Sequence, residues 1–378
     1  MPEQCPVPAG DSPPAATEPT ALVPAASPAA AAAGPARGRR PGRVLLAAAL
    51  AVGVTAASFG FALPRLASYG SAWASLRTMH WPGLVLIAAA FAVSQAATWA
   101  MIAAVLPSLR MRQAAAVNLG SSAVANTLPA GGAVAMGVSW AMLSSWGVGT
   151  AEYIRYTLVS GLWNVFVRLG LPAVALSVLA VAGGAGAGSQ AAAFAGACVL
   201  AGAVAGLWAM LRSEGFTRRT GELLAAAAAG FRLLRRPATA RIPGALLDFR
   251  AGAAGLLAQR GLRITVTTVA SHVSLWLVLL ACLRAGGLGQ GQVPWQSSLA
   301  AFAFARLLSV LPITPGGVGV VEVGLTAPLV AGLAPAAAGR VAAAVLMFRA
   351  VTYLLPLPLG AAAYLWWRWA RPQRKLGT

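Results

Sequence analysis

Long uninterrupted runs of apolar residues follow one another along the chain, separated by short polar segments. A helix needs about 20 consecutive apolar residues to cross the ~30 Å hydrocarbon core of a bilayer. We expect about six spanning helices from the unbroken runs, which cover residues 44–63, 81–106, 153–182, 191–211, 264–283 and 340–367. The pattern predicts an all-α, polytopic membrane protein.

Two further apolar runs, 113–146 and 295–333, are interrupted in the middle by proline and paired glycine. Proline removes a backbone donor and glycine loosens a helix, so each run is expected to break there. Each arm beside a break has about 15 residues, or roughly 22 Å of helix, which is too short to span. We therefore expect two re-entrant broken-helix hairpins; if they span instead, the chain makes about eight to ten crossings.

The two interrupted runs belong to an internal repeat. After each break comes a long apolar helix that carries a buried arginine behind phenylalanine and then a proline: Arg168 with Pro172, and Arg349 with Pro356. Each repeat holds an odd number of spanning helices and one hairpin, so the second repeat is inverted relative to the first. The hairpins then enter from opposite sides and meet near the midplane, as in many transporters.

Composition supports a membrane protein and charge supplies its orientation. The chain is 58% hydrophobic and 10% charged, whereas a soluble domain has roughly 25% charged residues. The net charge of +20 does not indicate a nucleic-acid partner, because the basic residues lie between the apolar runs. With both termini cytoplasmic, most of the 28 basic residues face the cytoplasm, as the positive-inside rule requires. The outer side then holds only Arg65, Arg77, Arg284 and Arg340.

These patterns divide the chain into five segments. They are a disordered Pro/Ala-rich basic cytoplasmic tail at 1–43, a first membrane half at 44–211, a basic cytoplasmic loop at 212–263, the rest of the second membrane half at 264–367, and a basic cytoplasmic tail at 368–378. Two loop segments, near 221–236 and 245–259, are candidate interfacial helices on an anionic leaflet; we prefer the simpler interpretation of a basic cytoplasmic loop. A single lysine, Lys375, and the abundance of alanine and glycine indicate a GC-rich bacterium, hence the bacterial inner membrane.

The sequence contains little that would suit catalysis by a soluble-type enzyme. Its three cysteines, Cys5, Cys198 and Cys282, are far apart, and its two histidines form no HExxH motif. We therefore expect no metal, no cofactor and no catalytic residue. The absence of a GxxxxGK[ST] motif means that no ATP site is expected.

Ionisable residues inside apolar segments are costly and default to functional hypotheses. Away from the segment ends, where Arg155 and Arg340 lie, the only acidic or strongly basic ones are Glu322, Arg168, Arg306 and Arg349. One interpretation is a cationic midplane cavity, in which arginines contact a lipid phosphate and Glu322 orients one of them or responds to a proton. The other is a structural ion pair, and the two are compatible. The hairpin breaks add further candidate binding residues: Asn126, Gly131, Gly132, Thr314, Pro315, Gly316 and Gly317.

Several other residues in apolar segments have simpler interpretations. Thr314 and Pro315 fit N-cap and first-turn positions of a helix whose N-terminus suits an anion. Interhelical hydrogen bonding is the preferred interpretation of Asn118, Asn164 and His272. Trp366, Trp367 and Trp369 are expected to be interface anchors.

The stretch 309–324, with its Thr-Pro-Gly-Gly core, followed by Phe348-Arg349, resembles the transmembrane region of lysylphosphatidylglycerol synthases, a flippase-like family. The segment 126–132 resembles the family's first motif, although Ala130 departs from its more glycine-rich form. The resemblance covers roughly residues 44–367. It implies a lipid-handling membrane domain, which in the namesake proteins translocates an aminoacylated phospholipid. Those synthases carry a soluble aminoacyl-transfer domain after their membrane helices, and no such domain follows Trp367, so we do not expect synthase activity.

The leading hypothesis is a lipid translocase that handles a phospholipid or a polyprenyl-phosphate-linked lipid by alternating access around the hairpins. Its partners would be membrane lipids with an anionic or zwitterionic headgroup. Two alternatives stay open at this point. One is a membrane-embedded glycosyl- or phospho-transferase that uses a lipid carrier, and the other is a non-transporting partner of an envelope complex. A homo-oligomer also stays open.

Overall fold

The structure is a computed structural model that describes residues 77, 80–127, 131–182, 187–230, 241–309 and 317–370; for 187–193 and 228–230 only the backbone is described. The chain divides into two compact units, 1–38 and 39–378. The first unit, the expected spanning helix at 44–63 and most of the C-terminal tail lie outside the described residues.

Every element in the described ranges is helical, in agreement with the predicted all-α class. Within the described part of the chain, five helical stretches are long and apolar enough to cross a membrane: Trp81–Val105, Thr150–Val181, Phe194–Arg212, Ile242–Ala285 and Pro335–Ala370. Many of their large apolar side chains are exposed, among them Val93, Val199 and Val266. Such surfaces suit a lipid environment and would be a liability in water. The chain is therefore a multi-pass membrane protein.

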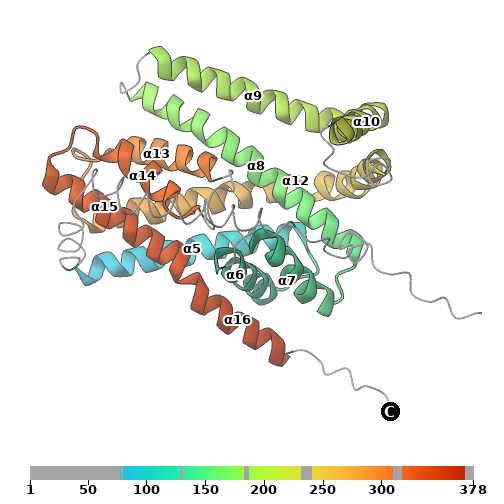
Figure 1. The fold of residues 1–378 in the computed structure, drawn as a ribbon, viewed down its shortest axis with the longest axis horizontal. Helices are drawn as coiled ribbons and strands as arrows, with labels where there is room; N and C mark the ends of the chain where they lie inside the picture. Colours follow the sequence, from blue (N-terminus) through green and yellow to red (C-terminus); the bar gives the residue numbers. More distant parts are fainter. Residues whose placement is uncertain are drawn as a thin grey trace, which may run out of the picture. The chain divides into compact units, whose positions relative to one another are not determined.

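Both interrupted runs form helical hairpins. The first consists of α6 (Met111–Thr127) and α7 (Gly131–Ser145), and the second of α13 (Trp295–Leu308) and α14 (Val320–Val330). Within each hairpin the two arms pack against each other. The first hairpin lies toward one end of the bundle and the second toward the opposite end (Figure 1). The arms have 17, 15, 14 and 11 residues, so at 1.5 Å per residue none reaches the ~30 Å of a full span.

The helices that precede the hairpins are α5 (Trp81–Val105) and α12 (Ile242–Ala285), and they pack side by side. A Cβ on Gly83, at the start of α5, would lie 2.8 Å from the Cβ of Ala285, at the end of α12. The start of one helix therefore meets the end of the other, and the two are antiparallel. Equivalent helices of two parallel repeats would run in the same direction, so this packing is what the inverted repeat requires.

The helices after the hairpins extend the same relation. The first hairpin is followed by α8 (Thr150–Val181), and the second by α15 (Pro335–Arg349), η3 (Ala350–Leu354) and α16 (Pro356–Ala370). Arm α6 packs on α16 and arm α13 packs on α8, so each hairpin contacts the last span of the other repeat. Two large hydrophobic cores result among the described residues. One contains residues of α13 and α14, and the other contains residues of α6 and α7.

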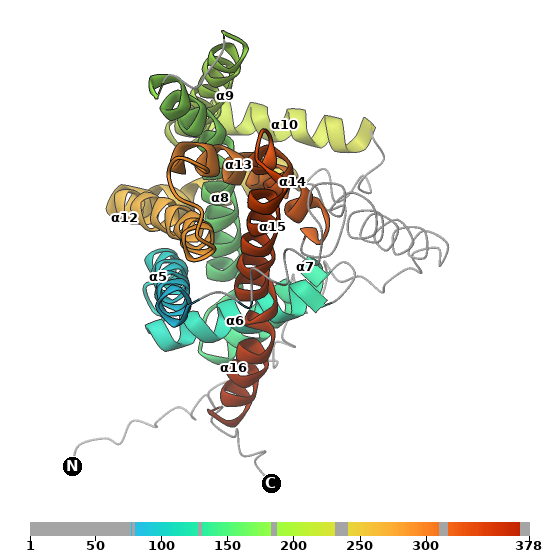
Figure 2. The ribbon, with the colours of Figure 1, turned by 90° about the vertical axis from the view of Figure 1, so that its left-hand side faces the viewer.

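The last span carries a local change of helix type in its middle. Residues 350–354 form a π-turn, in which the Leu355 N–H donates to the carbonyl of Ala350 at 2.9 Å. The α-helical pattern is interrupted just before Pro356, which has no N–H and whose ring would crowd the preceding turn. Figure 2 shows α15 and α16 continuing in line through this turn. Single π-turns inside helices are frequent at functional sites.

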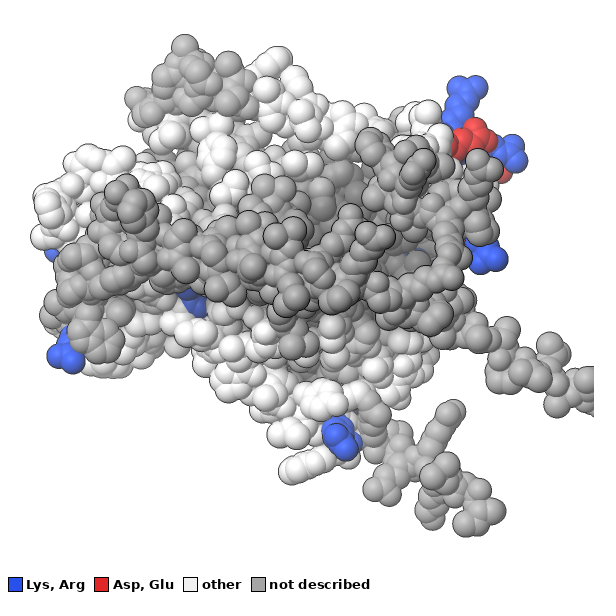
Figure 3. Space-filling view, viewed as in Figure 1, with Lys and Arg blue, Asp and Glu red and all other residues white. Residues whose placement is uncertain are grey.

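The basic loop is more ordered than the sequence predicts. The expected interfacial helix at 245–259 is not a separate element, because it forms the first part of the 44-residue α12. The segment near 221–236 corresponds in part to α10 (Glu214–Gly230), which follows α9 (Ala187–Arg212) and packs on α12. Helix α10 exposes Phe216, Leu223 and Leu224, which favours the interfacial interpretation over a plain loop. Basic and acidic side chains gather over this end of the bundle (Figure 3).

Candidate functional site

A buried ion pair joins the second hairpin to the last span. The Nε of Arg349 donates to Oε1 of Glu322 at 2.9 Å, and the two side chains are 13% and 4% exposed. The second carboxylate oxygen of Glu322 accepts the backbone N–H of Gly319 at 2.7 Å. Because Glu322 lies in the first turn of α14, its negative charge is also favoured by the helix dipole. The structural ion pair expected from the sequence is therefore present.

Tyr353 connects this ion pair to the first hairpin. Its hydroxyl donates to the backbone carbonyl of Asn126 at 2.6 Å, one of the carbonyls that the end of α6 leaves without an intrahelical partner. The Arg349 guanidinium carbon lies 4.7 Å from the centroid of the Tyr353 ring. One chain of contacts thus runs from the end of α6 to the start of α14, through Asn126, Tyr353, Arg349 and Glu322. The tips of the two hairpins meet at this chain.

Three further cationic or ionisable groups lie beside the pair. Arg306, at the end of α13, is within electrostatic range of Arg168 on α8 and of Arg349. His272, in the middle of α12, is within electrostatic range of Arg306 and Arg168. We call Arg168, Arg306 and His272 the cationic cluster. It gathers side chains from three different helices.

The cationic cluster is short of counter-charge and of hydrogen-bond acceptors. The Nε atoms of Arg168 and Arg306 and the Nε2 of His272 are buried and form no hydrogen bond with any residue that the structure describes. Glu322 is the only acidic residue in the apolar segments, and Arg349 binds it directly. Like charges repel strongly where water is scarce, and a buried donor without an acceptor costs about 1–3 kcal/mol. An anionic oxygen placed between these residues would relieve both costs.

Glycines shape the two hairpin tips. A Cβ on Gly131 would lie 2.6 Å from the carbonyl oxygen of Ala125, so only glycine lets α7 begin this close to α6. A Cβ on Gly132 would have no neighbouring atom within 4 Å, so a larger residue would fit there. In the second hairpin, Gly317 and Gly319 have φ values of +68° and +87°, a region that other residues rarely adopt. Gly319 holds the N–H that binds Glu322, so its conformation positions the carboxylate.

The structure brings most of the predicted site residues together, and some of their expected roles change. Seven of them come from the hairpin tips and the helices beside them: Glu322, Arg349, Arg306, Arg168, Asn126, Gly131 and Gly317. Thr314, Pro315 and Gly316 lie outside the described residues. Asn126 contributes a backbone carbonyl, where the sequence suggested its side chain. Whether any of these residues binds a lipid stays a prediction.

Three simpler expectations are corrected. Asn164 donates to the carbonyl of Ser160, and His272 Nδ1 contacts the carbonyl of Thr268, so both bonds are within one helix rather than between helices. Trp367 is not an interface anchor, because it is 2% exposed and its indole N–H donates to the Ser145 hydroxyl of α7. Trp369 is 84% exposed, as an anchor should be.

Sequence reasoning missed Tyr353, the residue that joins the hairpins. Its contact with Asn126 spans 227 residues of sequence, and a tyrosine in an apolar run carries no signal of its own. One clue was available. Tyr353 lies four residues after the buried Arg349, on the same helix face, and just before Pro356.

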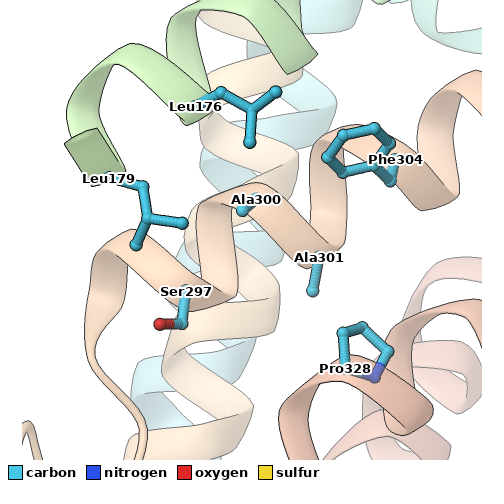
Figure 4. A pocket seen from close by; sticks show the side chains of 7 residues that line it. All are labelled: Leu176, Leu179, Ser297, Ala300, Ala301, Phe304 and Pro328. Carbon is cyan, nitrogen blue, oxygen red and sulfur yellow. The ribbon is translucent and has the colours of Figure 1, made fainter. Parts of the chain in front are cut away.

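An apolar groove lies beside the site, between α8, α13 and α14. Figure 4 shows Leu176 and Leu179 of α8 on one side, Phe304 and Ser297 of α13 across from them, and Pro328 of α14 beyond α13. Two alanines of α13 also line it, and among these lining residues Ser297 has the polar side chain. The groove is thus walled by both arms of the second hairpin and by the span that carries Arg168.

Comparison with known proteins is consistent with this architecture. No curated protein matches the chain. The family described as the lysylphosphatidylglycerol synthase TM region matches residues 29–360. This range includes every described helix except the last part of α16, and it contains both hairpins, the ion pair and the cationic cluster. The chain therefore belongs to the family of the lysylphosphatidylglycerol synthase TM region.

Proposed function

We propose that this protein translocates phospholipids, or polyprenyl-phosphate-linked lipids, across the membrane. The observation that carries the proposal is the cationic cluster, in which the Nε atoms of Arg168 and Arg306 are buried without an acceptor and neither guanidinium group has a carboxylate beside it in the described part of the chain. A lipid phosphate supplies the missing negative charge and acceptor oxygens, and arginine is well suited to bind phosphate through two hydrogen bonds. Membership of a family named for a membrane region of lipid synthases supports a lipid substrate.

The position of the cluster favours transport over static binding. The cluster lies where the tips of two hairpins from opposite ends of the bundle meet. Inverted repeats with broken helices place substrate sites at such a point and expose them alternately to the two sides. The Arg349–Glu322 pair then holds the second hairpin in place rather than binding lipid, which assigns the phosphate to Arg168 and Arg306.

The transferase alternative is less well supported. Enzymes of that kind use carboxylates as bases or metal ligands. Both oxygens of Glu322 are engaged by Arg349 and by Gly319, so this carboxylate is not available as a base in the observed state. The described residues contain no group of three metal-binding side chains.

We also propose that the protein resides in a bacterial inner membrane with both termini in the cytoplasm. The proposal rests on the distribution of basic residues. In this orientation the α10 end of the bundle is cytoplasmic, and the loop between α12 and α13 lies outside.

The proposal can be tested by reconstituting the purified full-length protein in liposomes that contain headgroup-labelled phosphatidylglycerol. An impermeant reductant quenches the label in the outer leaflet only. We expect quenching well beyond half of the label for the wild-type protein. We expect the Arg168→Gln and Arg306→Gln variants to slow translocation at least about tenfold, which corresponds to a loss of ~1.4 kcal/mol of stabilisation of the moving lipid.

A matched control is Arg218→Gln, which removes an exposed arginine of α10 from the same protein. This variant should translocate at the wild-type rate, because its charge is far from the hairpin tips in sequence and is exposed to solvent. Quenching that stops at half for phosphatidylglycerol, phosphatidylcholine and a polyprenyl phosphate, with and without an imposed proton gradient, would refute the translocase. Equal rates in all three arginine variants would refute the cationic cluster as its site.

A further inference from the structure

His272 lies on α12, one of three helices that pack against one another. Helix α12 packs on α8 and on α13, and these two pack on each other. The histidine is 3% exposed. Among the described residues, its electrostatic partners are Arg306 on α13 and Arg168 on α8. The imidazole therefore belongs to the same buried cluster as the two arginines, and the proposed function leaves it without a role.

The hydrogen-bond partners of the imidazole determine which nitrogen can change its charge. Nδ1 lies 3.1 Å from the backbone carbonyl oxygen of Thr268, which can only accept a hydrogen bond. The hydroxyl of Ser271 is 3.3 Å from Nδ1, but it donates to the same carbonyl at 2.7 Å. Nδ1 therefore carries a hydrogen, and Nε2 is the nitrogen that gains or loses a proton.

Nε2 of His272 is buried and has no hydrogen-bond partner in the described part of the chain. A proton on this atom would add a third positive charge beside Arg168 and Arg306, and the new N–H would lack an acceptor. Both effects are unfavourable where water is scarce. The observed arrangement therefore suits a neutral imidazole with its hydrogen on Nδ1.

The other elements packed on α12 do not supply a compensating negative charge. Helix α5 has no ionisable residue. On α15, Arg349 is bound to Glu322, and Arg340 lies beside Gly286, just beyond the end of α12. The remaining ionisable residues on these elements are Cys198 and Arg212 on α9, and Glu214, Arg218, Arg219 and Glu222 on α10, which meets α12 in its first turn.

An anion at the cluster reverses this balance. To bind an anionic oxygen, each of the three unpartnered nitrogens must donate a hydrogen bond. The Nε of an arginine always carries its hydrogen, whereas Nε2 of His272 can donate only after it has taken up a proton. We propose that His272 is a proton-binding site coupled to the anion, so that a phosphate bound at Arg168 and Arg306 brings one proton onto Nε2. The inference rests on the proposed function and adds the proton as a second ligand.

Coupling of this kind is reciprocal, because the proton and the phosphate stabilise each other in one site. Falling pH strengthens anion binding, and rising pH weakens it. One proton cancels the single charge of a phosphodiester, so the two ligands cross the membrane together without net charge. Translocation should then follow the pH difference, from the acidic to the alkaline side, and should not respond to the membrane potential.

Nuclear magnetic resonance can observe the charge of His272 directly, because the chain contains only two histidines. The full-length His80→Gln variant, labelled with ¹⁵N-histidine and purified without a histidine tag, gives signals from His272 alone. Near pH 6, close to the ordinary titration range of histidine, we expect a neutral ring with its hydrogen on Nδ1 in maltoside detergent. Bound dihexanoylphosphatidylglycerol should protonate both nitrogens, and the phosphate-free dihexanoylglycerol should leave the ring neutral.

Calorimetry of the same binding counts the protons. Titrations in two buffers of different ionisation enthalpy should show uptake of about one proton per bound probe for the wild-type protein and none for His272→Asn. An asparagine at this position can still donate to the Thr268 carbonyl, as Asn164 donates to that of Ser160 at 2.8 Å. His80→Gln is the matched control, and it should take up the proton as the wild-type protein does.

The pH dependence of affinity gives a further readout. Between about pH 6 and pH 7, affinity of the wild-type protein for the probe should fall roughly threefold to tenfold, the upper limit being that of one proton per pH unit. The affinity of His272→Asn should change by less than about twofold over the same range. Equal pH dependence in the two proteins would overturn the proton site.

The outcomes separate this inference from the proposed function. A ring that stays neutral with the probe bound, or that is doubly protonated before the probe is added, overturns the proton site and leaves the anion site in place. A probe that does not bind overturns both. Proton uptake on binding in a protein that translocates nothing retains the coupled site and refutes the translocase.

Liposomes with a pH difference across the membrane test the coupling during transport. The wild-type protein should accumulate labelled phosphatidylglycerol in the leaflet on the alkaline side, whereas His272→Asn should only equilibrate the two leaflets. A potassium diffusion potential imposed without a pH difference should produce no accumulation. Equilibration by the wild-type protein whatever the pH difference would refute proton-coupled transport.

Discussion

Glu322 is fixed at both of its oxygens, by Arg349 through one and by the Gly319 N–H through the other. It lies at the start of α14, where a negative charge is favoured by the helix dipole. In a buried pair of this kind, the cost of removing charge from water is offset only while both partners are present. The ion pair therefore holds the second hairpin in place. Its removal should first lower the stability of the folded protein.

Glu322→Gln should destabilise the protein strongly. The substitution leaves Arg349 buried without its counter-ion, and breaking a buried ion pair by removing one partner costs about 3–5 kcal/mol. Thermal unfolding in detergent should show a clear decrease in Tm. The double variant with Arg349→Gln should recover part of the loss, whereas Glu222→Gln on the exposed face of α10 should change the stability by less than about 0.5 kcal/mol. A Tm of Glu322→Gln equal to that of the wild-type protein would show that the ion pair does not hold the second hairpin in place.

Tyr353→Phe isolates the bond between the hairpins. The variant keeps the ring beside Arg349 but removes the hydroxyl that donates to Asn126, so we expect a loss of about 0.5–1.5 kcal/mol in the free energy of unfolding. Tyr364→Phe is the matched control, since Tyr364 is 38% exposed on α16. Equal effects of the two variants on thermal stability would show that the contact between the hairpins contributes nothing.

The sequence identified the charged residues of the site but not how they pair. Glu322 and the arginines stand out because an ionisable side chain in an apolar run is costly wherever it points. Which arginine binds the glutamate depends on a contact across 27 residues of chain, and spacing alone cannot determine it. Arg168 and Arg349 are equivalent in the repeat, yet Arg349 has the carboxylate and Arg168 has none among the residues that the structure describes.

Among the elements, α16 and α6 illustrate how glycine allows two spanning segments to approach closely. Where Gly360 meets Leu119, no side chain separates the two backbones. Small residues are favoured at helix contacts in membranes because packing, rather than the hydrophobic effect, holds the helices together there.

Gly360→Ala should open or strain this contact. Overpacking costs typically about 1–3 kcal/mol, and we expect a corresponding decrease in Tm in detergent. Gly255→Ala is the matched control, because Gly255 lies inside α12 with open space where the Cβ would be added. The control should be neutral or stabilising by up to ~1 kcal/mol, since alanine favours a helix. Stabilisation by both substitutions would contradict the close contact.

At this scale the sequence predicted the spans and breaks well and their extents less well. Hydropathy locates a span because about 20 apolar residues must lie in lipid, and proline with paired glycine locates a break. The 44-residue length of α12 was not predictable from hydropathy, because its first part lies before the apolar run and packs against α10. The π-turn at 350–354 was not predictable either. Pro356 indicates that the helix is irregular at this point but does not determine which type of turn forms.

For the whole molecule, the inverted repeat fixes which ends of the bundle lie on the same side of the membrane. The start of α5 meets the end of α12, and each hairpin contributes to a different hydrophobic core. The proposed orientation of this arrangement in the membrane rests on the basic residues alone.

Cysteine accessibility tests the orientation. In a background without the native cysteines, Gln292→Cys lies in the exposed loop after α12, and Glu222→Cys lies on α10. An impermeant maleimide should label Gln292→Cys in intact spheroplasts and Glu222→Cys only after permeabilisation. The reverse pattern would invert the proposed orientation without affecting the repeat itself.

The difference between the two repeat interfaces has a consequence for motion. One chain contains the same pair of elements twice. At α6–α16 the backbones meet at Gly360, whereas α8 and α13 pack together with an apolar groove beside them that α14 borders. Under the proposed transport, each repeat displays the geometry that the other would adopt if their roles were exchanged. Exchanging the two interfaces then gives the second state, and its distance between α6 and α16 is what a spin-label pair across them should report in the presence of lipid.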